Sequence, residues 1–176
     1  YEFPWTTSIP DYAFRGCSAL TSVEIPTGVT KIGTYAFYSC SSLTGIRIPS
    51  GVTTIGTYAF YNCSSLTGIQ IPAGVTSIGN DTFERCSELT SIEIPSGVAT
   101  IGSAAFKDCT KLKKITVPSS VTKVSNNAFA GCPFETAGPA GSGCDYEFAW
   151  TTSIPGSAFY GCRNLTSVEI PSTVTD

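Results

Sequence analysis

A repeat of 23 residues constrains this chain more than any other feature of its sequence. The stretch from Ile48 to Gln70 is followed by a variant of itself that begins at Ile71. Each copy carries a phenylalanine with a cysteine three residues later; the phenylalanines are Phe14, Phe37, Phe60, Phe83, Phe106, Phe129 and Phe159. Only the last of them departs from the 23-residue spacing. A fixed period in this range predicts a solenoid of seven units, in which each unit contacts only its neighbours.

Each unit divides into two extended arms joined by corners. In the first arm, around Ile69, apolar and polar residues alternate, which predicts a strand with one buried face. Pro72 ends this arm, because proline donates no hydrogen bond to a neighbouring strand. The second arm buries Val75 and Ile78, and the corner that carries Phe83 is predicted to be one helical or 3-10 turn. We therefore expect a solenoid of mainly parallel β-structure with short helical or 3-10 corner turns.

Glycine recurs where the second arm meets the corner, at Gly33, Gly56, Gly79 and Gly102. Such a row indicates either a turn with positive φ or a close approach of the backbone. The same position holds Pro10, Ser125 and Pro155, and proline fixes φ near about −65°. Either the turn differs in those units, or the glycines are required for space.

The period breaks once, after Cys132. Residues 133–145 are rich in Gly and Pro, which predicts a loop. This loop is either a surface excursion from a continuous solenoid or a joint between two modules. Residues 146–176 match residues 1–31 at 22 of 31 positions, with an offset of 145, which supports the joint. We therefore assign units one to six to 1–132, the loop or joint to 133–145, and the start of a second module, stacked on the first, to 146–176.

Composition excludes several classes of function. The chain is 41% apolar and 13% charged, which argues against disorder. Its net charge of −3 is too small to predict binding to nucleic acid or an anionic membrane. No apolar run reaches the roughly 18 residues of a membrane span. Histidine, the commonest general base, is absent. Methionine and a signal peptide are also absent, so we interpret the chain as a mature or excised piece of a longer protein.

The repeated pattern CxxLxxIxIPxxVxxIGxxAFxx resembles the BspA-type, or Treponema-type, leucine-rich repeats over nearly the whole chain. The segment from Pro139 to Pro155 also resembles an element that recurs in large gut-bacterial proteins of this kind. The resemblance implies a curved solenoid with a parallel β-sheet on one face. It also implies surface-exposed or secreted bacterial proteins, with relatives in parasitic protists, that act in adhesion and protein binding. Thr82, Ser125 and the inserted loop depart from the pattern without threatening the implied fold.

Seven of the eight cysteines share one repeat position: Cys17, Cys40, Cys63, Cys86, Cys109, Cys132 and Cys162. Neighbouring coils of a parallel stack lie about 4.8 Å apart, which is wider than the Cβ separation of about 3.8 Å that a disulfide prefers. No CxxC motif or histidine supports zinc, and a nucleophilic cysteine needs a base. We predict a ladder of buried, reduced thiols, with Cys144 as the one thiol off the ladder.

Half of the basic residues are lysines in neighbouring units: Lys107, Lys111, Lys113, Lys114 and Lys123. They form either a patch for an anionic glycan or acidic protein, or ion pairs with acidic side chains on the preceding coil. Glu84 and Glu88 lie one period before Lys107 and Lys111, which favours ion pairs there. Lys113, Lys114 and Lys123 stay unexplained by this interpretation.

Tyrosines form two rows on the corners of the first three units, at Tyr12, Tyr35 and Tyr58 and at Tyr38 and Tyr61. Residues three apart on a turn share a face, so the two rows should lie side by side. These columns either cover the core or offer a surface to a sugar or a protein partner.

The outward side chains of the first arms form the main candidate binding face. They are Glu24, Arg47, Gln70, Glu93, Lys114, Thr116 and Glu169. A flat surface of such side chains among small residues suits an extended partner. The chain has neither a carboxylate pair in an apolar setting nor a Gly-rich phosphate loop. We predict no catalytic site, cofactor or metal.

We expect a non-enzymatic protein-binding or adhesion module of a bacterial surface or secreted protein, with a protein or glycan ligand on the strand face. The alternative is a structural spacer or a self-assembling, filament-forming solenoid. The first unit offers Tyr1, Phe3 and Trp5 at one end, and the last offers Val168 and Ile170 at the other. Two different open surfaces on one body favour end-to-end association. Neither nucleic acid nor membrane insertion is expected.

Overall fold

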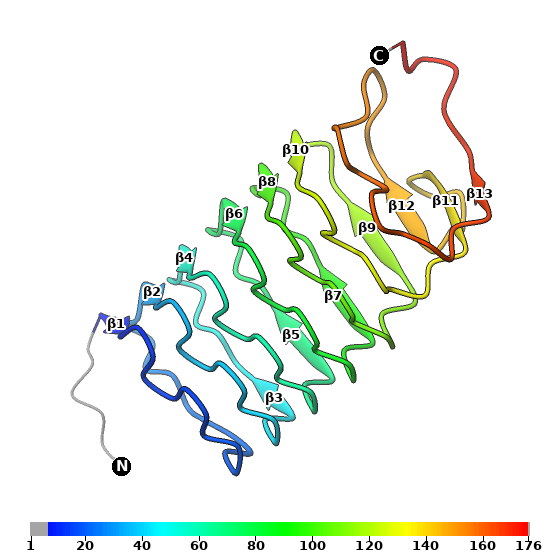
Figure 1. The fold of residues 1–176 in the computed structure, drawn as a ribbon. Helices are drawn as coiled ribbons and strands as arrows, with labels where there is room; N and C mark the ends of the chain where they lie inside the picture. Colours follow the sequence, from blue (N-terminus) through cyan, green and yellow to red (C-terminus); the bar gives the residue numbers. More distant parts are fainter. Residues whose placement is uncertain (1–6, 176) are drawn as a thin grey trace.

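The protein is a solenoid of stacked coils, as predicted (Figure 1). The computed structural model describes residues 7–175, which form short parallel strands joined by turns, with no helix in this range. The predictions made for Tyr1, Phe3 and Trp5 lie outside the described residues. No segment of residues 7–175 forms a helix able to cross a bilayer.

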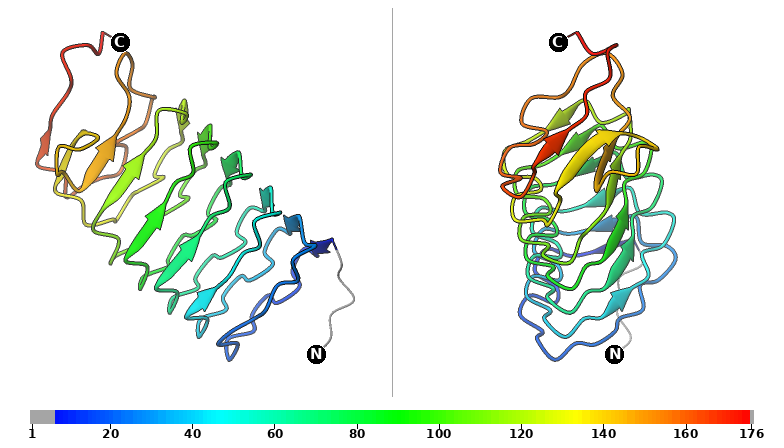
Figure 2. Two further views of the ribbon diagram at one scale, coloured as in Figure 1. Left: turned by 180° about the vertical axis from the view of Figure 1, so that it is seen from behind. Right: turned by 90° about the vertical axis from the view of Figure 1, so that its right-hand side faces the viewer.

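The strands form two rows along the stack (Figure 2). The second arms contain β1 (Ser8–Ile9), β2 (Lys31–Ile32), β4 (Thr54–Ile55), β6 (Ser77–Ile78), β8 (Thr100–Ile101) and β10 (Lys123–Val124). The first arms contain β3 (Gly45–Ile46), β5 (Gly68–Gln70), β7 (Ser91–Glu93), β9 (Ile115–Val117), β12 (Tyr146–Phe148) and β13 (Ser167–Val168). One further strand, β11 (Thr136–Pro139), belongs to neither arm of the repeat. The sheet orders are β1-β2-β4, β10-β8-β6, β3-β5-β7 and β13-β11-β12-β9.

The parallel register keeps equivalent residues of successive repeats in contact. Ile46 pairs with Ile69, which pairs with Ile92, and each step is one 23-residue period. Inside the stack the phenylalanine rings lie over one another; Phe37 and Phe60 are 5.2 Å apart between centroids with a 4° interplanar angle. Each inward row is therefore one continuous column of the core.

The corners are series of tight turns and not the helical or 3-10 turns that the sequence predicts. The Ala36 N–H donates to the Gly33 carbonyl at 3.3 Å, and the Tyr38 N–H donates to the Tyr35 carbonyl at 3.2 Å. Tyr35 and Ser39 have φ values of 57° and 55°, in the left-handed region. Because residues in this conformation cannot continue a right-handed helix, each turn stops after one hydrogen bond.

The left-handed residues also free alternate N–H groups for the next coil. Tyr35 donates to the Thr57 carbonyl at 3.0 Å, and Phe37 donates to the Ala59 carbonyl at 2.8 Å. In the second arm the direction is reversed, since the Gly56 N–H donates back to Ile32 at 2.9 Å. Corners and second arms therefore join neighbouring coils with hydrogen bonds of opposite direction.

The glycine row is explained by space. None of these glycines has a positive φ, but a Cβ on Gly56 would lie 2.5 Å from the Thr34 nitrogen of the preceding coil. A Cβ on Gly102 would lie 2.6 Å from the Asn80 nitrogen. Pro10 lies in the first described coil, where no earlier described coil approaches it.

Residues 133–145 contain a strand where the sequence predicts only a loop. β11 lies between β12 and β13, although it precedes both in the chain. Ala137 pairs with Tyr146 on one side and with Val168 on the other. Only residues 140–145 connect β11 to β12, which is shorter than the dozen or more residues usual for parallel strands. We call the segment 133–150 the joint segment.

Aromatic side chains of the joint segment fill the space between the sixth and seventh corners. Tyr146 lies 5.1 Å from Phe129 and 5.3 Å from Phe159, measured between ring centroids. Phe134 packs against both Phe129 and Tyr146. These tilted contacts replace the parallel ring stacking of the regular coils.

The inter-coil hydrogen bonds stop at the same place. Within residues 7–175, no backbone hydrogen bond joins 118–132 to 150–163. A cavity of about 240 Å³ opens there, lined partly by Thr122 and Thr152. The Trp150 indole N–H donates to the Val121 carbonyl at 2.8 Å across this gap. The last coil, which stands out of line with the others in Figure 1, is therefore attached through its first-arm strands and aromatic side chains.

Candidate binding surface

The strand face presents a row of exposed side chains over four consecutive coils. Glu24, Arg47, Gln70 and Glu93 are all exposed. Glu24 and Arg47 share a parallel bridge, and Gln70 pairs with Glu93 in the same register. The predicted residues of this part of the face therefore lie side by side, one on each coil.

Two glycines beside this row are not required by packing. An ideal Cβ on Gly45 or on Gly68 would meet no atom within 4 Å. Both glycines lie on the same side of the sheet as Arg47 and Gln70, two residues away in each strand. Their effect is to leave the sheet backbone accessible and the surface flat.

Lys114 and Thr116 are exposed as well, but the next position of the row is covered. The outward side chain that follows Thr116 across the sheet is Glu147, which is only 7% exposed. Its carboxylate accepts hydrogen bonds from the N–H groups of Gly141 and Gly143 at 3.1 and 3.0 Å. It also forms an ion pair with the Lys114 ammonium at 3.1 Å. The Gly141 amide and the Lys114 ammonium hold the pKa of Glu147 below its usual range. Lys114 is thus partly committed to a structural ion pair.

Glu169 is also separated from the row. β11 and β12 lie between β9, which carries Thr116, and the strand that precedes Glu169. Its backbone N–H donates to the Ala137 carbonyl at 2.8 Å. The predicted face is therefore continuous from Glu24 to Thr116 and interrupted at Glu147. The alternation of Tyr146, Glu147 and Phe148 was the one sequence signal that could have indicated an outward Glu147.

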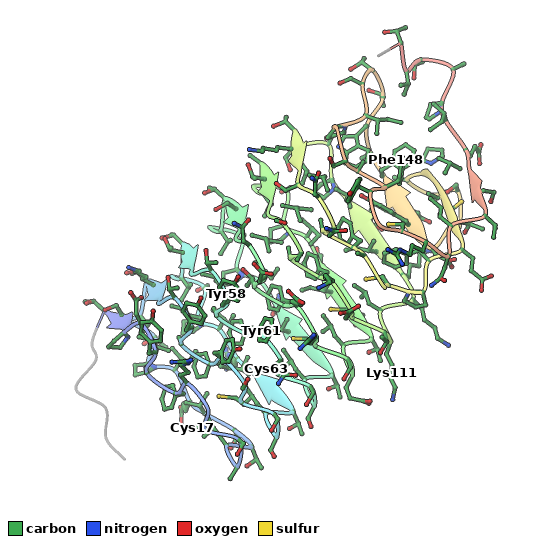
Figure 3. All side chains as sticks on the ribbon, viewed as in Figure 1. Cys17, Tyr58, Tyr61, Cys63, Lys111 and Phe148 are labelled. Atoms are coloured by element: carbon green, nitrogen blue, oxygen red, sulfur yellow. The ribbon has the colours of Figure 1, made fainter. Side chains whose placement is uncertain are left out.

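The tyrosine columns form as predicted, and stacking covers part of their ring faces. Tyr35 lies 5.1 Å from Tyr12 and 4.7 Å from Tyr58, with interplanar angles of 6° and 3°. Tyr38 and Tyr61 stack at 4.7 Å. Tyr61 lies beside Tyr58 on the same corner, with 5.7 Å between ring centroids (Figure 3). Because Tyr35 has a ring on each of its faces, only its edge and its hydroxyl group are left for a ligand.

Arginines lie over the ends of these columns. The Arg15 guanidinium is 5.8 Å from the Tyr12 ring centroid and 5.5 Å from that of Tyr38. Arg85 lies 5.9 Å from Tyr61. Such cation–π contacts contribute about 0.5–1 kcal/mol at exposed sites, and they reduce the ring area left for a ligand.

Two carboxyl groups meet where the tyrosine columns end. Burial, followed by a hydrogen bond to Glu84, raises the pKa of Asp81 to about 6. Burial alone would raise the pKa of Glu84, but hydrogen bonds from Asp81 and Lys107 hold it below its usual range. Burial and a hydrogen bond to Asp81 raise the pKa of Tyr58. The cluster therefore places groups with opposite pKa shifts side by side at the edge of the column.

The predicted ion pairs between coils are present. The Lys107 Nζ lies 2.9 Å from Glu84 Oε1, and the Lys111 Nζ lies 2.7 Å from Glu88 Oε2. Lys113 and Lys123 are exposed and form no ion pair with another residue of the described range. These ion pairs explain the positions of Lys107 and Lys111 without a ligand.

The cysteines form a ladder of buried thiols with a specific bonding pattern. From Cys40 to Cys132 each ladder Sγ donates to the phenylalanine carbonyl 26 residues earlier, as from Cys63 to Phe37 at 3.2 Å. In the last coil the distance from Cys162 to the Phe129 carbonyl grows to 3.9 Å. All are free thiols in the structure. The prediction of burial is wrong for Cys17, which is exposed because no earlier described coil covers it.

Metal ligation finds no support in the described residues. Within 7–175, no group of three or more His, Cys, Asp or Glu side chains is placed to hold a metal ion.

Comparison with known proteins identifies the repeat. A family model described as BspA type leucine rich repeat region matches residues 7–135 and 149–176, in six copies. The unmatched residues between these ranges carry most of the joint segment. No protein with a curated description matches the chain.

Three solved bacterial structures share the fold. A T. pallidum leucine rich repeat protein is 30% identical, with a TM-score of 0.66 over 94% of this chain and 64% of its own. A leucine-rich repeat protein from Bacteroides ovatus is 32% identical, with a TM-score of 0.70 over 99% of this chain and 42% of its own. One from Eubacterium ventriosum is 27% identical, with a TM-score of 0.54 over 92% and 50%. The chain spans less than two thirds of the length of each.

Proposed function

We propose, because this chain belongs to the BspA type leucine rich repeat family, that it is a non-enzymatic binding module of a bacterial surface or secreted protein. Its ligand is an extended protein segment that lies across the strands of the exposed face from Glu24 to Glu93. The observation that carries the proposal is the flat strip at Gly45 and Gly68, where open space exists for side chains that the chain does not have.

The charge order of the strip supports a specific partner. Along the stack the outward side chains of the strip are acidic at Glu24, basic at Arg47, neutral at Gln70 and acidic at Glu93. Neighbouring strands place these groups about 4.8 Å apart. A segment with basic, acidic and basic residues at matching intervals would meet each charge with its opposite, which favours register and specificity.

A selection from a random peptide library tests this assignment. Peptides that bind the native chain should lose most of their affinity for the double variant Arg47→Glu and Gln70→Glu, because the strip then carries four negative charges. The melting temperature should change little, since both side chains are exposed. The control pair Lys123→Glu and Thr54→Glu, both exposed on second arms, makes the same total change of charge. Equal affinity for the double variant and the control would contradict the proposal.

The second candidate function is a structural spacer that associates end to end. It is favoured by the apolar side chains Val168 and Ile170, which are 40% and 47% exposed on the last coil. Sedimentation of the native chain over a wide range of concentrations tests it. A single monomeric species at high concentration would rule out self-association of this chain.

A further inference from the structure

The first and last coils share one apolar surface. In the first coil, a shallow hollow on the outer side is lined by Ile9, Phe14, Val23, Glu24, Ile25, Pro26 and Val29. At an offset of 145 the last coil carries Ile154, Phe159, Val168, Glu169, Ile170, Pro171 and Val174. All seven residues are identical. The structure therefore contains two copies of this surface in two environments.

In the last coil the part of this surface around Val168 and Glu169 is a docking site for β11. The Thr166 N–H donates to the Glu135 carbonyl at 2.8 Å, and the Thr166 hydroxyl donates to the same oxygen at 3.0 Å. The Glu169 N–H donates to the Ala137 carbonyl at 2.8 Å. Ala137 faces Val168 in the parallel register. The coil is thus recognised through two backbone donors and one apolar pairing.

The same groups are open in the first coil. Thr21, Val23 and Glu24 correspond to Thr166, Val168 and Glu169. The Glu24 bridge to Arg47 joins the first coil to the second, and the described range holds no coil on the other edge of Thr21 and Glu24. Both residues are exposed. An edge with free donors in this spacing is a template for one more strand.

We propose that the outer edge of the first coil is a module-to-module joint that binds the 133–145 segment of a second copy of this module. The added strand would take the register of β11 on β13, with Ala137 of the incoming module against Val23. Its Glu135 and Ala137 carbonyls would accept from Thr21 and Glu24.

The spacing of the chain supports this occupant over an unrelated strand. Residues 133–145 directly precede the copy that begins at Tyr146, so a module placed before Tyr1 would present the same segment at the same distance. The incoming strand must also be small. A Cβ on Gly138 would lie 2.8 Å from the Cys144 Sγ and 2.9 Å from the Ser142 Oγ. The segment folds its own loop against itself, which a generic strand would not do.

An extended chain tests the proposal. A second copy of residues 133–145 is placed before Tyr1, and amide hydrogen exchange is measured by NMR at Thr21 and Glu24. We expect exchange at both amides to slow at least about tenfold, which corresponds to about 1.4 kcal/mol, and the melting temperature to rise. The matched control carries the same extension with Ala137→Asp in the added copy, which sets a carboxylate against Val23.

Two results would overturn the proposal. The first is unchanged exchange at Thr21 and Glu24 in the extended chain. The second is equal protection in the Ala137→Asp control, because protection would then come from any extension. Val23→Asp in the receiving coil, with its fold checked by circular dichroism, should abolish the protection independently of the added segment.

Discussion

Two regions of this molecule solve the same packing problem in different ways. From residue 7 to residue 132 every coil repeats the contacts of the coil before it: a ring stack, a thiol bond and backbone hydrogen bonds in arms and corners. From residue 133 to 175 the corner and second-arm backbone hydrogen bonds to residues 118–132 are lost, and a strand inserted out of sequence order joins the last coil to the stack. The stack is held by repetition, whereas the joint is held by a few individual side chains.

This difference indicates where the solenoid should open first. A typical hydrogen bond contributes about 0.5–1.5 kcal/mol to stability, so a missing ladder of them weakens the attachment of one coil. Buried aromatic side chains compensate at the joint, above all Tyr146, Phe148 and Trp150. We therefore expect the last coil to exchange with an open form more readily than any coil of the stack.

Truncation of one fully buried ring in each region should give the largest effects. Phe60→Ala and Phe148→Ala should each cost about 3–5 kcal/mol, the usual range for deleting a buried aromatic side chain. Phe60→Ala should destabilise the whole stack, whereas Phe148→Ala should release residues 149–175 alone. Hydrogen-exchange mass spectrometry separates these outcomes, and Tyr61→Ala, at a half-buried ring, should cost less than either. Equal loss of protection over residues 7–132 in both variants would show that the joint is no separate unit.

The indole hydrogen bond across the joint should give the next effect. Trp150→Phe retains an aromatic ring but removes the N–H that reaches the carbonyl of the buried Val121. An unsatisfied buried acceptor costs about 1–3 kcal/mol. Protection of residues 149–175 should fall by the corresponding factor, with Tyr38→Phe as a control in the stack. Unaltered exchange in this range would mean that a solvent molecule replaces the donor without loss.

Thiol alkylation of the native protein compares the two regions without mutation. Cys17 and Cys144 should react first, because neither is buried. Burial raises the pKa of Cys162 to about 11 and that of Cys40 to about 12, so both resist as long as their coils stay closed. Opening of the last coil at about 1.4 kcal/mol less than the stack would make Cys162 about tenfold faster than Cys63. Equal rates for Cys162 and Cys63, followed by mass spectrometry, would show that the two regions open together.

Removal of one hydroxyl should strengthen the joint. The Tyr146 hydroxyl is buried and has no hydrogen-bond partner in the part of the chain that the structure describes. Its desolvation is therefore uncompensated, and Tyr146→Phe should stabilise the protein by about 1 kcal/mol. A denaturant titration measures the change. A loss of stability would instead reveal a solvent partner for this hydroxyl.

The smallest effect concerns pH and lies within the stack. The pKa of Asp81 is raised from 3.8 to about 6, so the folded state holds a proton that the unfolded state has lost between these values. Stability from this group should therefore fall as the pH rises from about 4 to about 6. Glu84, whose pKa is lowered, acts in the opposite sense and loses its contribution as the pH falls.

Asp81→Asn tests the contribution of Asp81 to the pH dependence of stability. Melting temperatures at several pH values from 4 to 7 should show a flatter profile for this variant than for the native chain. Asp108→Asn provides a control at another left-handed corner position. An unchanged profile for Asp81→Asn would place the raised pKa elsewhere in the cluster.

The sequence predicts the stack well because each of its contacts is made many times. The 23-residue spacing of Phe60 and Phe83 places their rings in one column, and the spacing of Glu84 and Lys107 places an ion pair between coils. The corner conformation was missed, although the repeat position of Ser39 holds Gly16, Asn62 and Gly131 in other units, residue types that favour a positive φ. The tyrosine at position 35 gives no such indication. At these positions the hydrogen bonds to the next coil outweigh the local preference against positive φ.

The joint could not be predicted for a different reason. β11 pairs with strands that follow it in the chain, and no local pattern in residues 133–145 encodes that order. As a consequence Glu147 is covered by Gly141 and Gly143, and the candidate face ends earlier than the alternation of residues suggests. The face from Glu24 to Glu93 lies in the regular part, where register follows directly from the period.

The opposed hydrogen bonds of corners and second arms affect how long such a stack can grow. Aligned peptide units, each with a dipole of about 3.5 D, build up partial charge at the two ends of a helix. Here the N–H of Tyr35 points toward the following coil, while the N–H of Gly56 points toward the preceding one. The two sets oppose each other within every coil, so added coils contribute dipoles that partly cancel. The partial charge at the end of a long stack is then similar to that at the end of a short one, so this charge does not limit the number of coils.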